Sequence, residues 1–373
     1  MTDYRHIYVH VPFCGRRCTY CDFSIAVRRE VPVSEYVDAI VAELVTRRLE
    51  APSGPIRTLY FGGGTPSKLG GTGVEQLIHR IADWANSGQL STAEQGAEIT
   101  LEANPEDVTA DAAARWVASG VNRISLGVQS FDAGVLEWMH RGHGPEGARE
   151  AVRILRAAGV ASISVDLIFA APEHLNRNWT ADLDAAISLD VEHLSVYGLT
   201  VESHTPLGRW TARGEVAEAP EERYEREFLE AHDRLTSAGF EHYEVSNYGR
   251  PGHRARHNSA YWTGVPYLGL GPSAHGFDGS ERRWNTAAYA EWQRQLAAGV
   301  DPLEGRENVQ GSAAERIYLG LRTSDGLDIH ENEVKTVTLW LGQGWATLDG
   351  RRLRLTPQGW LRLDSLAAAL LAG

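Results

Sequence analysis

Cysteine is scarce in this chain of 373 residues, which contains only three. A small and odd number of cysteines does not suit a scaffold held by disulfides, so we expect reduced thiols and a cytoplasmic protein. The opening segment MTDYRHIYVHV lacks the basic and apolar regions of a secretory signal. Long apolar runs are missing as well, and a stretch of about 18 such residues would be needed to span a bilayer.

Net positive charge is also absent. Lys and Arg number 36 against 49 Asp and Glu, which gives a net charge of -13. This balance argues against a broad nucleic-acid-binding surface. We find no low-complexity tract and no repeat of fixed period. The length and the hydrophobic content of 43% predict one large domain with one or two smaller ones.

Apolar and amphipathic runs alternate over roughly the first half of the chain. The apolar runs predict six buried strands, at 6–11, 57–63, 97–104, 122–130, 162–170 and 193–200. The amphipathic runs predict helices at 34–50, 74–85, 110–119, 147–159 and 180–189. Repeated strand–helix units pair in parallel through right-handed crossovers. The sequence therefore predicts an α/β fold, an incomplete (β/α)6 TIM-like barrel.

Three domains are predicted along the chain. The barrel core occupies residues 1–235 and ends with an acidic helix at 220–239, while 236–300 form a connecting segment rich in Gly, aromatic residues and His. The sequence of 301–373 predicts a smaller α+β domain of winged-helix type, with a helix at 313–322 and a strand pair at 345–356. From 306 onward the basic and acidic residues number eight each, which argues against DNA binding there.

All three cysteines lie in the stretch VHVPFCGRRCTYCDFSI, as Cys14, Cys18 and Cys21. The odd count disfavours a disulfide. A structural zinc ion normally takes four ligands from two paired spacings, and no fourth partner is evident. Three thiolates spaced C-x3-C-x2-C suit three irons of a [4Fe–4S] cluster, whose fourth iron is then open to another ligand.

Polar residues also gather where the predicted strands end, the position of active sites in barrel proteins. Glycines 62–64 follow the second strand and allow a ligand to approach the backbone, although no G-K-[ST] follows as in a phosphate loop. Glu102 and Gln129 end the third and fourth strands, and Asp166 interrupts the apolar fifth strand. One such carboxylate could be a paired structural group, but three polar residues at successive strand ends predict a ligand cradle.

The cysteine spacing after the first strand resembles that of the radical S-adenosylmethionine enzymes. In that superfamily the open iron binds the amino and carboxylate groups of S-adenosylmethionine, which an electron from the cluster cleaves to a 5′-deoxyadenosyl radical. Within it, the chain is most similar to the oxygen-independent coproporphyrinogen III oxidase and its relatives. The resemblance implies that S-adenosylmethionine is lined by Tyr8, Tyr20, Gly63, Gly64, Thr65, Glu102, Gln129, Arg141 and Asp166.

Two departures separate the chain from the oxidase. The oxidase has a further cysteine two residues after the third, where this chain has Phe23, and it has a long extension before the cluster loop. The segment HNSAYW at 257–262 instead matches the H-N-x-x-Y-W signature of the HemW heme chaperone family. The resemblance implies transfer of heme to apo-hemoproteins, without coproporphyrinogen oxidase activity. An oxidase, a radical methyltransferase and a purely structural iron–sulfur module remain the alternatives.

The same resemblance makes His257 the candidate heme ligand, because a neutral imidazole is a good axial ligand of iron. The alternative is that His257 and Asn258 cap the backbone while Tyr261 and Trp262 fill the core. His275, in GPSAHGF, is a weaker second candidate. Membrane respiratory enzymes as heme acceptors, peripheral contact with the membrane and a homodimer are further expectations from the family.

Overall fold

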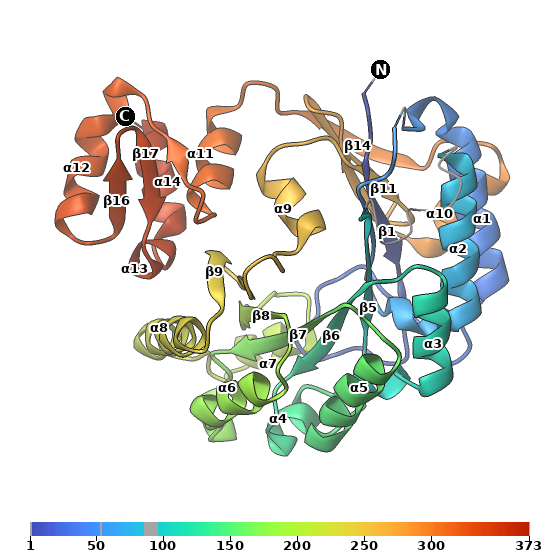
Figure 1. The fold of residues 1–373 in the computed structure, drawn as a ribbon, viewed down its shortest axis with the longest axis horizontal. Coiled ribbons are helices and arrows are strands. Elements are labelled where there is room, and N and C mark those ends of the chain that lie inside the picture. The colour runs from blue at the N-terminus through green and yellow to red at the C-terminus, as the bar shows by residue number, and fades with distance from the viewer. Residues whose placement is uncertain (1, 53, 86–95, 373) are drawn as a thin grey trace.

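A sheet of nine strands forms the centre of the computed structural model, which describes residues 2–52, 54–85 and 96–372 (Figure 1). Its six consecutive parallel strands are β1 (His6–Val11), β4 (Thr58–Gly63), β5 (Glu98–Ala103), β6 (Arg123–Gln129), β7 (Ser162–Phe169) and β8 (His193–Gly198). All six predicted strands are thereby confirmed, and every predicted site residue lies in the described part of the chain.

Helices cover the outer side of this sheet (Figure 1). The five predicted between the strands are confirmed as α1 (Val33–Thr46), α2 (Gly70–Trp84), α3 (Ala110–Ala118), α5 (Pro145–Ala157) and α6 (Trp179–Ser188). Local chemistry sets where they begin. The hydroxyl of Thr109 accepts a hydrogen bond from the first turn of α3, and Asn178 does the same for α6. A short helix, α4 (Ala133–Trp138), was not predicted.

Alternation along the strands decides which side chains line the site. In β1, Ile7, Val9 and Val11 are fully buried beneath the helices, so Tyr8 and His10 face the inside of the sheet. The parallel register places Glu102 beside Ser125 and Gly127 beside Asp166. The polar residues that interrupt the apolar strands therefore share the inner face.

The sheet continues beyond the six predicted strands. On one side β11 (Leu268–Leu270) pairs in parallel with β1, and on the other β10 (Asn247–Gly249) and β9 (Glu241–Glu244) add two antiparallel strands next to β8. The acidic segment forms α8 (Glu221–Ser237), as predicted. Because β11 and β9 are the two ends of the sheet order, the barrel is open, which confirms the incomplete barrel. The predicted domain limits at 235 and 300 stay a prediction.

Residues 256–308 contain elements that the sequence did not predict. They are α9 (Arg256–Trp262), α10 (Tyr289–Ala297) and an antiparallel sheet of β12 (His275–Phe277), β13 (Glu281–Asn285) and β14 (Leu303–Asn308). A buried carboxylate, Glu43, fixes them to α1. It accepts hydrogen bonds from the Gly271 amide at 2.9 Å, the Asn285 amide at 2.7 Å and the Trp292 indole at 3.1 Å. These donors satisfy a charge that would otherwise be costly to bury.

The C-terminal part lies at the end of the molecule away from α1–α3 (Figure 1). It contains α11 (Ala313–Leu321), β15 (Leu327–Asp328), α12 (Val334–Gly342), β16 (Ala346–Asp349), β17 (Arg352–Leu355), α13 (Pro357–Trp360) and α14 (Leu363–Ala372). Among the described residues there are also short 3-10 helices, η1 (Arg48–Glu50), η2 (Pro66–Leu69), η3 (Pro105–Asp107), η4 (Glu173–Leu175) and η5 (Glu331–Glu333). The predicted helix and strand pair are confirmed, and the winged-helix type stays a prediction.

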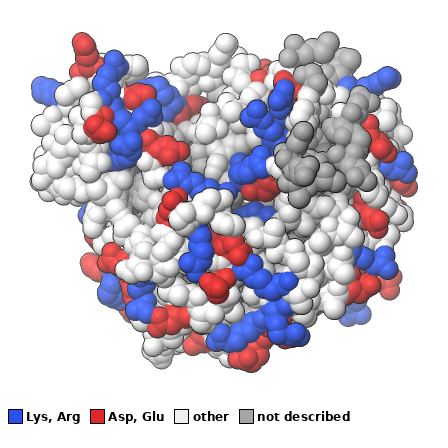
Figure 2. Space-filling model, in the orientation of Figure 1, with Lys and Arg blue, Asp and Glu red and all other residues white. Residues whose placement is uncertain are grey.

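Charges of both signs are mixed over the face shown in Figure 2, with no extended basic area visible there. Among the described residues, no helix combines the length and the apolar character needed to cross a membrane.

Candidate functional site

The cysteine loop is closed at its base by a pair of very short parallel strands, β2 (Phe13–Cys14) and β3 (Ala26–Val27). The amide of Ala26 donates to the Pro12 carbonyl at 2.7 Å, and the amide of Arg28 donates to Cys14 at 2.9 Å. Farther out, the Leu207 amide of α7 (Pro206–Ala212) donates to Thr19 at 2.9 Å. The loop is thus held at its base and at its tip.

The three cysteines line one cavity of about 680 Å³, here called the cysteine cavity, at the C-terminal ends of the strands. The Cys14 sulfur lies 3.3 Å from the Thr65 hydroxyl, and Cys18 accepts a hydrogen bond of 3.5 Å from Arg141. Burial raises the pKa of Cys14 and raises that of Cys21 to about 11, so metal binding must displace protons from these thiols.

The cysteine sulfurs do not gather around a single point. In the part of the chain that the structure describes, no three His, Cys, Asp or Glu side chains converge as one metal ion would require. A structural zinc ion draws its ligands together, whereas the sulfurs that bind a cubane cluster attach to different irons. The three thiols that line the cysteine cavity suit three irons of such a cluster.

Two glycines let the end of β4 pass close to this loop. A Cβ atom on Gly64 would lie 2.8 Å from the Pro12 carbonyl, and one on Gly63 would lie 2.6 Å from the His10 ring. Gly63 also has a φ of 108°, which other residues rarely adopt. A side chain at Gly64 would push the base of the loop away from the end of β4, and one at Gly63 would displace the His10 ring.

Two buried carboxyl groups face the cysteine cavity. Glu102 accepts hydrogen bonds from the Tyr60 hydroxyl at 2.7 Å and the Gly63 amide at 3.0 Å, and burial raises its pKa to about 7. Asp166 accepts from the Ser125 hydroxyl at 3.1 Å, and its pKa is also raised by burial. Neither forms an ion pair with another described residue. The site therefore suits a ligand that carries positive charge and hydrogen-bond donors.

Arg141 turns inward instead of ending a helix in solvent. One of its terminal nitrogens donates to Asn104 and to the Gly127 carbonyl, both at 2.6 Å, while its buried Nε has no hydrogen-bond partner. Nearby, a bulge in β6 gives Gln129 a φ of 72°, an uncommon conformation for a residue other than glycine. This Nε is a buried donor without an acceptor among the described residues, which is uncommon in native structures.

The cysteine cavity brings together most of the predicted residues: Cys14, Cys18, Cys21, Tyr20, Gly63, Gly64, Thr65, Glu102, Gln129, Arg141 and Asp166. Tyr8 is not among them. Its hydroxyl lies 3.1 Å from the His10 ring, and it faces a neighbouring cavity. The sequence reasoning missed Asn104 and Ser125, although Asn104 directly follows β5 and Ser125 alternates into the same face as Gly127.

His257 lies in neither cavity and is 1% exposed. One ring nitrogen is 2.6 Å from the Thr58 hydroxyl and the other is 2.8 Å from the Tyr261 hydroxyl. Its backbone amide donates to Glu98 at 2.8 Å, and burial lowers the pKa of its ring to about 3. Both nitrogens are therefore already used, so ligation of heme iron would require these bonds to break.

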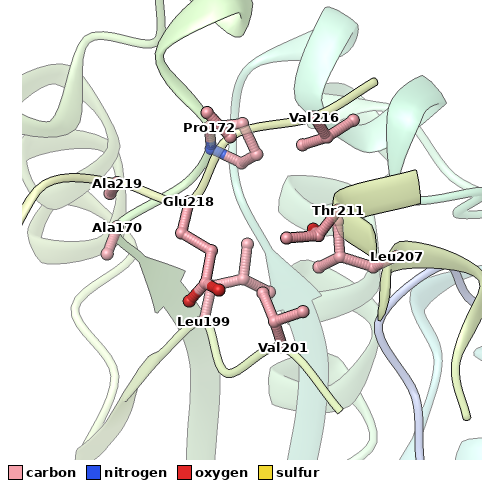
Figure 3. A pocket seen from close by; sticks show the side chains of 10 residues that line it. Ala170, Pro172, Leu199, Val201, Leu207, Thr211, Val216, Glu218 and Ala219 are labelled. Carbon is pink, nitrogen blue, oxygen red and sulfur yellow. The ribbon is translucent and has the colours of Figure 1, made fainter. Parts of the chain in front are cut away.

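The neighbouring cavity, here called the aromatic cavity, measures about 710 Å³. It lies between the inner face of β1 and the segment from α9 to β13, and Phe23, Gly63 and Glu102 border both cavities. Another pocket, lined by Ala170 after β7, Leu207 of α7 and Glu218 among others, has a volume of only about 10 Å³ (Figure 3). That volume is about one water molecule, so it cannot accept a cofactor.

Comparisons with known proteins agree with this architecture. Residues 8–186 match the radical SAM superfamily model. Over its full length the chain resembles the Escherichia coli structure entitled coproporphyrinogen III oxidase (HemN), with a TM-score of 0.79, 21% identity and coverage of 99% of this chain and 90% of that one. At this identity the likeness shows the fold, and it confirms the predicted radical SAM barrel with a C-terminal domain.

Closer relatives are found among proteins named heme chaperone HemW. The one from Mycobacterium tuberculosis strain H37Rv is 35% identical over 98% of this chain and 94% of the relative. The one from Escherichia coli K12 is 34% identical over 98% of each. A mouse mitochondrial protein named radical S-adenosyl methionine domain-containing protein 1 is 31% identical over 98% of this chain and 87% of its own length. The chain therefore belongs to the HemW heme chaperone family of the radical SAM superfamily.

Proposed function

We propose that this protein is a heme chaperone, which binds heme and transfers it to apo-hemoproteins, and that it carries a [4Fe–4S] cluster and S-adenosylmethionine. The observation that carries the proposal is the similarity, over 98% of the chain, to two proteins named heme chaperones. The cysteine cavity supports it, because the three thiols and the polar strand ends fit the two cofactors that the superfamily implies.

Cys14, Cys18 and Cys21 would hold the cluster, which leaves one iron for S-adenosylmethionine. When bound, the cluster and S-adenosylmethionine would supply one-electron chemistry. Arg141 donates a hydrogen bond to Cys18 and keeps positive charge beside the thiolates. The β2–β3 closure and the glycines at the end of β4 fix the distance between loop and sheet.

Glu102 and Asp166 give the cysteine cavity its preference for cations. Each is buried, and each is held by hydroxyl or amide donors rather than by a basic side chain. S-adenosylmethionine carries a sulfonium and an ammonium group, which such carboxyls favour when they are ionised. At pH values above about 7 Glu102 is charged, since burial raises its pKa to about 7.

One feature of this chain argues against the oxidase alternative. Phe23 stands where the oxidase has its further cysteine, and it is 56% exposed at the border of the cysteine cavity. We therefore propose that coproporphyrinogen is not converted. Membrane respiratory enzymes as acceptors, peripheral membrane contact, a homodimer and a cytoplasmic location belong to the same proposal as family expectations.

Heme titration of the purified, cluster-loaded protein tests the proposal. Heme should bind at about one per chain, and an apo-hemoprotein should gain activity when the loaded protein is added. Heme alone at the same concentration is the control for spontaneous uptake. In a parallel anaerobic incubation with S-adenosylmethionine, coproporphyrinogen should be recovered unchanged. Release of carbon dioxide from coproporphyrinogen would make the protein an oxidase, and the absence of heme binding would end the chaperone proposal.

A further inference from the structure

The aromatic cavity has the size and the walls of a site for a large planar ligand. Its volume of about 710 Å³ lies within the range typical of small-molecule sites. Aromatic side chains from separate segments line it: Phe23 from the cysteine loop, Tyr261 and Trp262 from α9, Tyr267 just before β11, and Phe277 from β12. Such rings pack favourably against a flat apolar face.

Phe23 is the least protected of these rings, with 56% of its surface exposed. Covering this apolar ring with an apolar ligand would be favourable. The same side chain borders the cysteine cavity. A ligand in the aromatic cavity would therefore lie next to the cysteine loop.

His275 is the one histidine of the described chain that enters this cavity with an exposed side chain. No described residue forms a hydrogen bond to its ring, which stacks on Trp284 with the ring centres 5.7 Å apart. Its pKa is lowered by burial and by the nearby Arg282, so at neutral pH the ring is neutral and able to bind a metal. His10, which also lines the cavity, is already bonded through both nitrogens, to Tyr8 and Ser24.

The strand register places a cation beside this histidine. Phe277 pairs with Arg282 and His275 pairs with Trp284, so these four side chains share one face of the β12–β13 ribbon. Arg282 donates to Glu315 at 2.7 Å, and its side chain is 31% exposed. Heme combines an apolar macrocycle, an iron that takes an axial imidazole, and two carboxylates, and these features correspond to the rings, to His275 and to Arg282.

We propose that heme binds in the aromatic cavity with His275 as its axial iron ligand, and that His257 is a structural residue. This inference rests on the proposed heme chaperone function. It differs from the sequence-based prediction because the two histidines have opposite surroundings: His257 is enclosed with both ring nitrogens bonded, whereas His275 is exposed with both free.

The test compares heme spectra and affinities of cluster-loaded variants. Replacement of His275 by Ala should shift the heme absorption and paramagnetic resonance spectra and weaken binding by about tenfold or more, and added free imidazole should restore the spectrum. His79→Ala, at an exposed position on α2, is the matched control and should leave both unchanged. Phe23→Asp should weaken heme binding without changing the ligand-dependent spectrum, since it alters the wall and not the ligand.

The outcomes separate this proposal from the proposed function. If wild-type protein binds no heme, the chaperone function itself fails. If wild-type protein binds heme but His275→Ala keeps the same spectrum and affinity, the ligand assignment fails while the chaperone function stands. A spectral change in His257→Gln but not in His275→Ala would return the ligand role to His257. Circular dichroism of each variant establishes that the fold is intact.

Discussion

The buried carboxyl of Glu102 should lower the stability of this protein as pH rises, and Glu102→Gln should remove the part of the pH dependence that this group causes. Burial is the largest influence on this group, and it outweighs the hydrogen bonds from Tyr60 and Gly63, so the pKa rises from 4.5 to about 7. The folded state therefore keeps this proton in a pH range where the unfolded chain has already released it.

The size of the effect follows from the difference between the two pKa values. A shift from 4.5 to about 7 corresponds to about 3 kcal/mol, at about 1.4 kcal/mol per pKa unit. Because the folded-state pKa is the higher one, this penalty is absent below pH 4.5, grows as pH rises to 7 and is constant above it. Gln is uncharged throughout and can still accept from the Gly63 amide. When the pH is raised from 5 to 8, the free energy of unfolding of the variant should therefore increase by about 2–3 kcal/mol relative to that of wild type.

Urea unfolding midpoints of the cluster-free chain at pH 5 and pH 8 provide the measurement. Glu137→Gln on α4, an exposed position, is the control and should show no gain between the two pH values. Infrared spectroscopy at pH 6 gives an independent check, because the band of a protonated carboxyl should be weaker in Glu102→Gln. If the variant and wild type differ by the same amount at both pH values, Glu102 is ionised throughout and the reasoning is refuted.

Three further predictions concern the cofactors and the core. Changing Cys14, Cys18 and Cys21 together to Ala should abolish a content of about four irons and four sulfides per chain, and metal and sulfide analysis that finds this content retained would rule out the cluster site. S-adenosylmethionine should perturb the paramagnetic resonance spectrum of the reduced cluster, and Asp166→Asn should raise the concentration of S-adenosylmethionine needed for this change. An unchanged wild-type spectrum at saturating S-adenosylmethionine would exclude binding of this cofactor to the open iron. Glu43→Ala should lower the free energy of unfolding by about 3–5 kcal/mol, since it leaves the buried donors of Gly271, Asn285 and Trp292 without their acceptor, at about 1–3 kcal/mol for each unsatisfied group, and a loss below about 1 kcal/mol in denaturant titration would show that the network is not essential.

Much of the barrel could be predicted from the sequence because its strands are buried on both faces. A parallel strand such as Thr58–Gly63, with all six residues buried, appears in the sequence as a short continuous apolar run. Amphipathic helices between such runs leave few alternatives to a parallel sheet. The carboxyl ends of these strands then meet at one edge, which is why Glu102, Gln129 and Asp166 were predicted to share a site and line one cavity.

The segment around the aromatic cavity could not be predicted in the same way. Strand β13, Glu281–Asn285, has the sequence ERRWN and only one fully buried residue, so no apolar run marks it. Its place depends on pairing with β12 and β14 and on the contact of Asn285 with Glu43, 242 positions earlier. The role of His257 shows the same limit. A motif specifies which residues occur together, but not whether tertiary contacts bury the ring.

The position of β1 explains why the cysteine cavity and the aromatic cavity lie next to each other and why Tyr8 lies in the second. Taken alone, the first strand of an open barrel would be an edge strand, but β11, far along the chain, pairs with it from Leu268 opposite Ile7 and makes it an interior strand. The inward side chains Tyr8 and His10 therefore have structure on both sides. Toward β4–β8 lie the strand ends of the cysteine cavity, and toward β11 and α9 lies the aromatic cavity. Since Gly63 and Glu102 border both, the inner face of a single sheet can present a polar cofactor site and an aromatic site side by side, with the cysteine loop as their common wall.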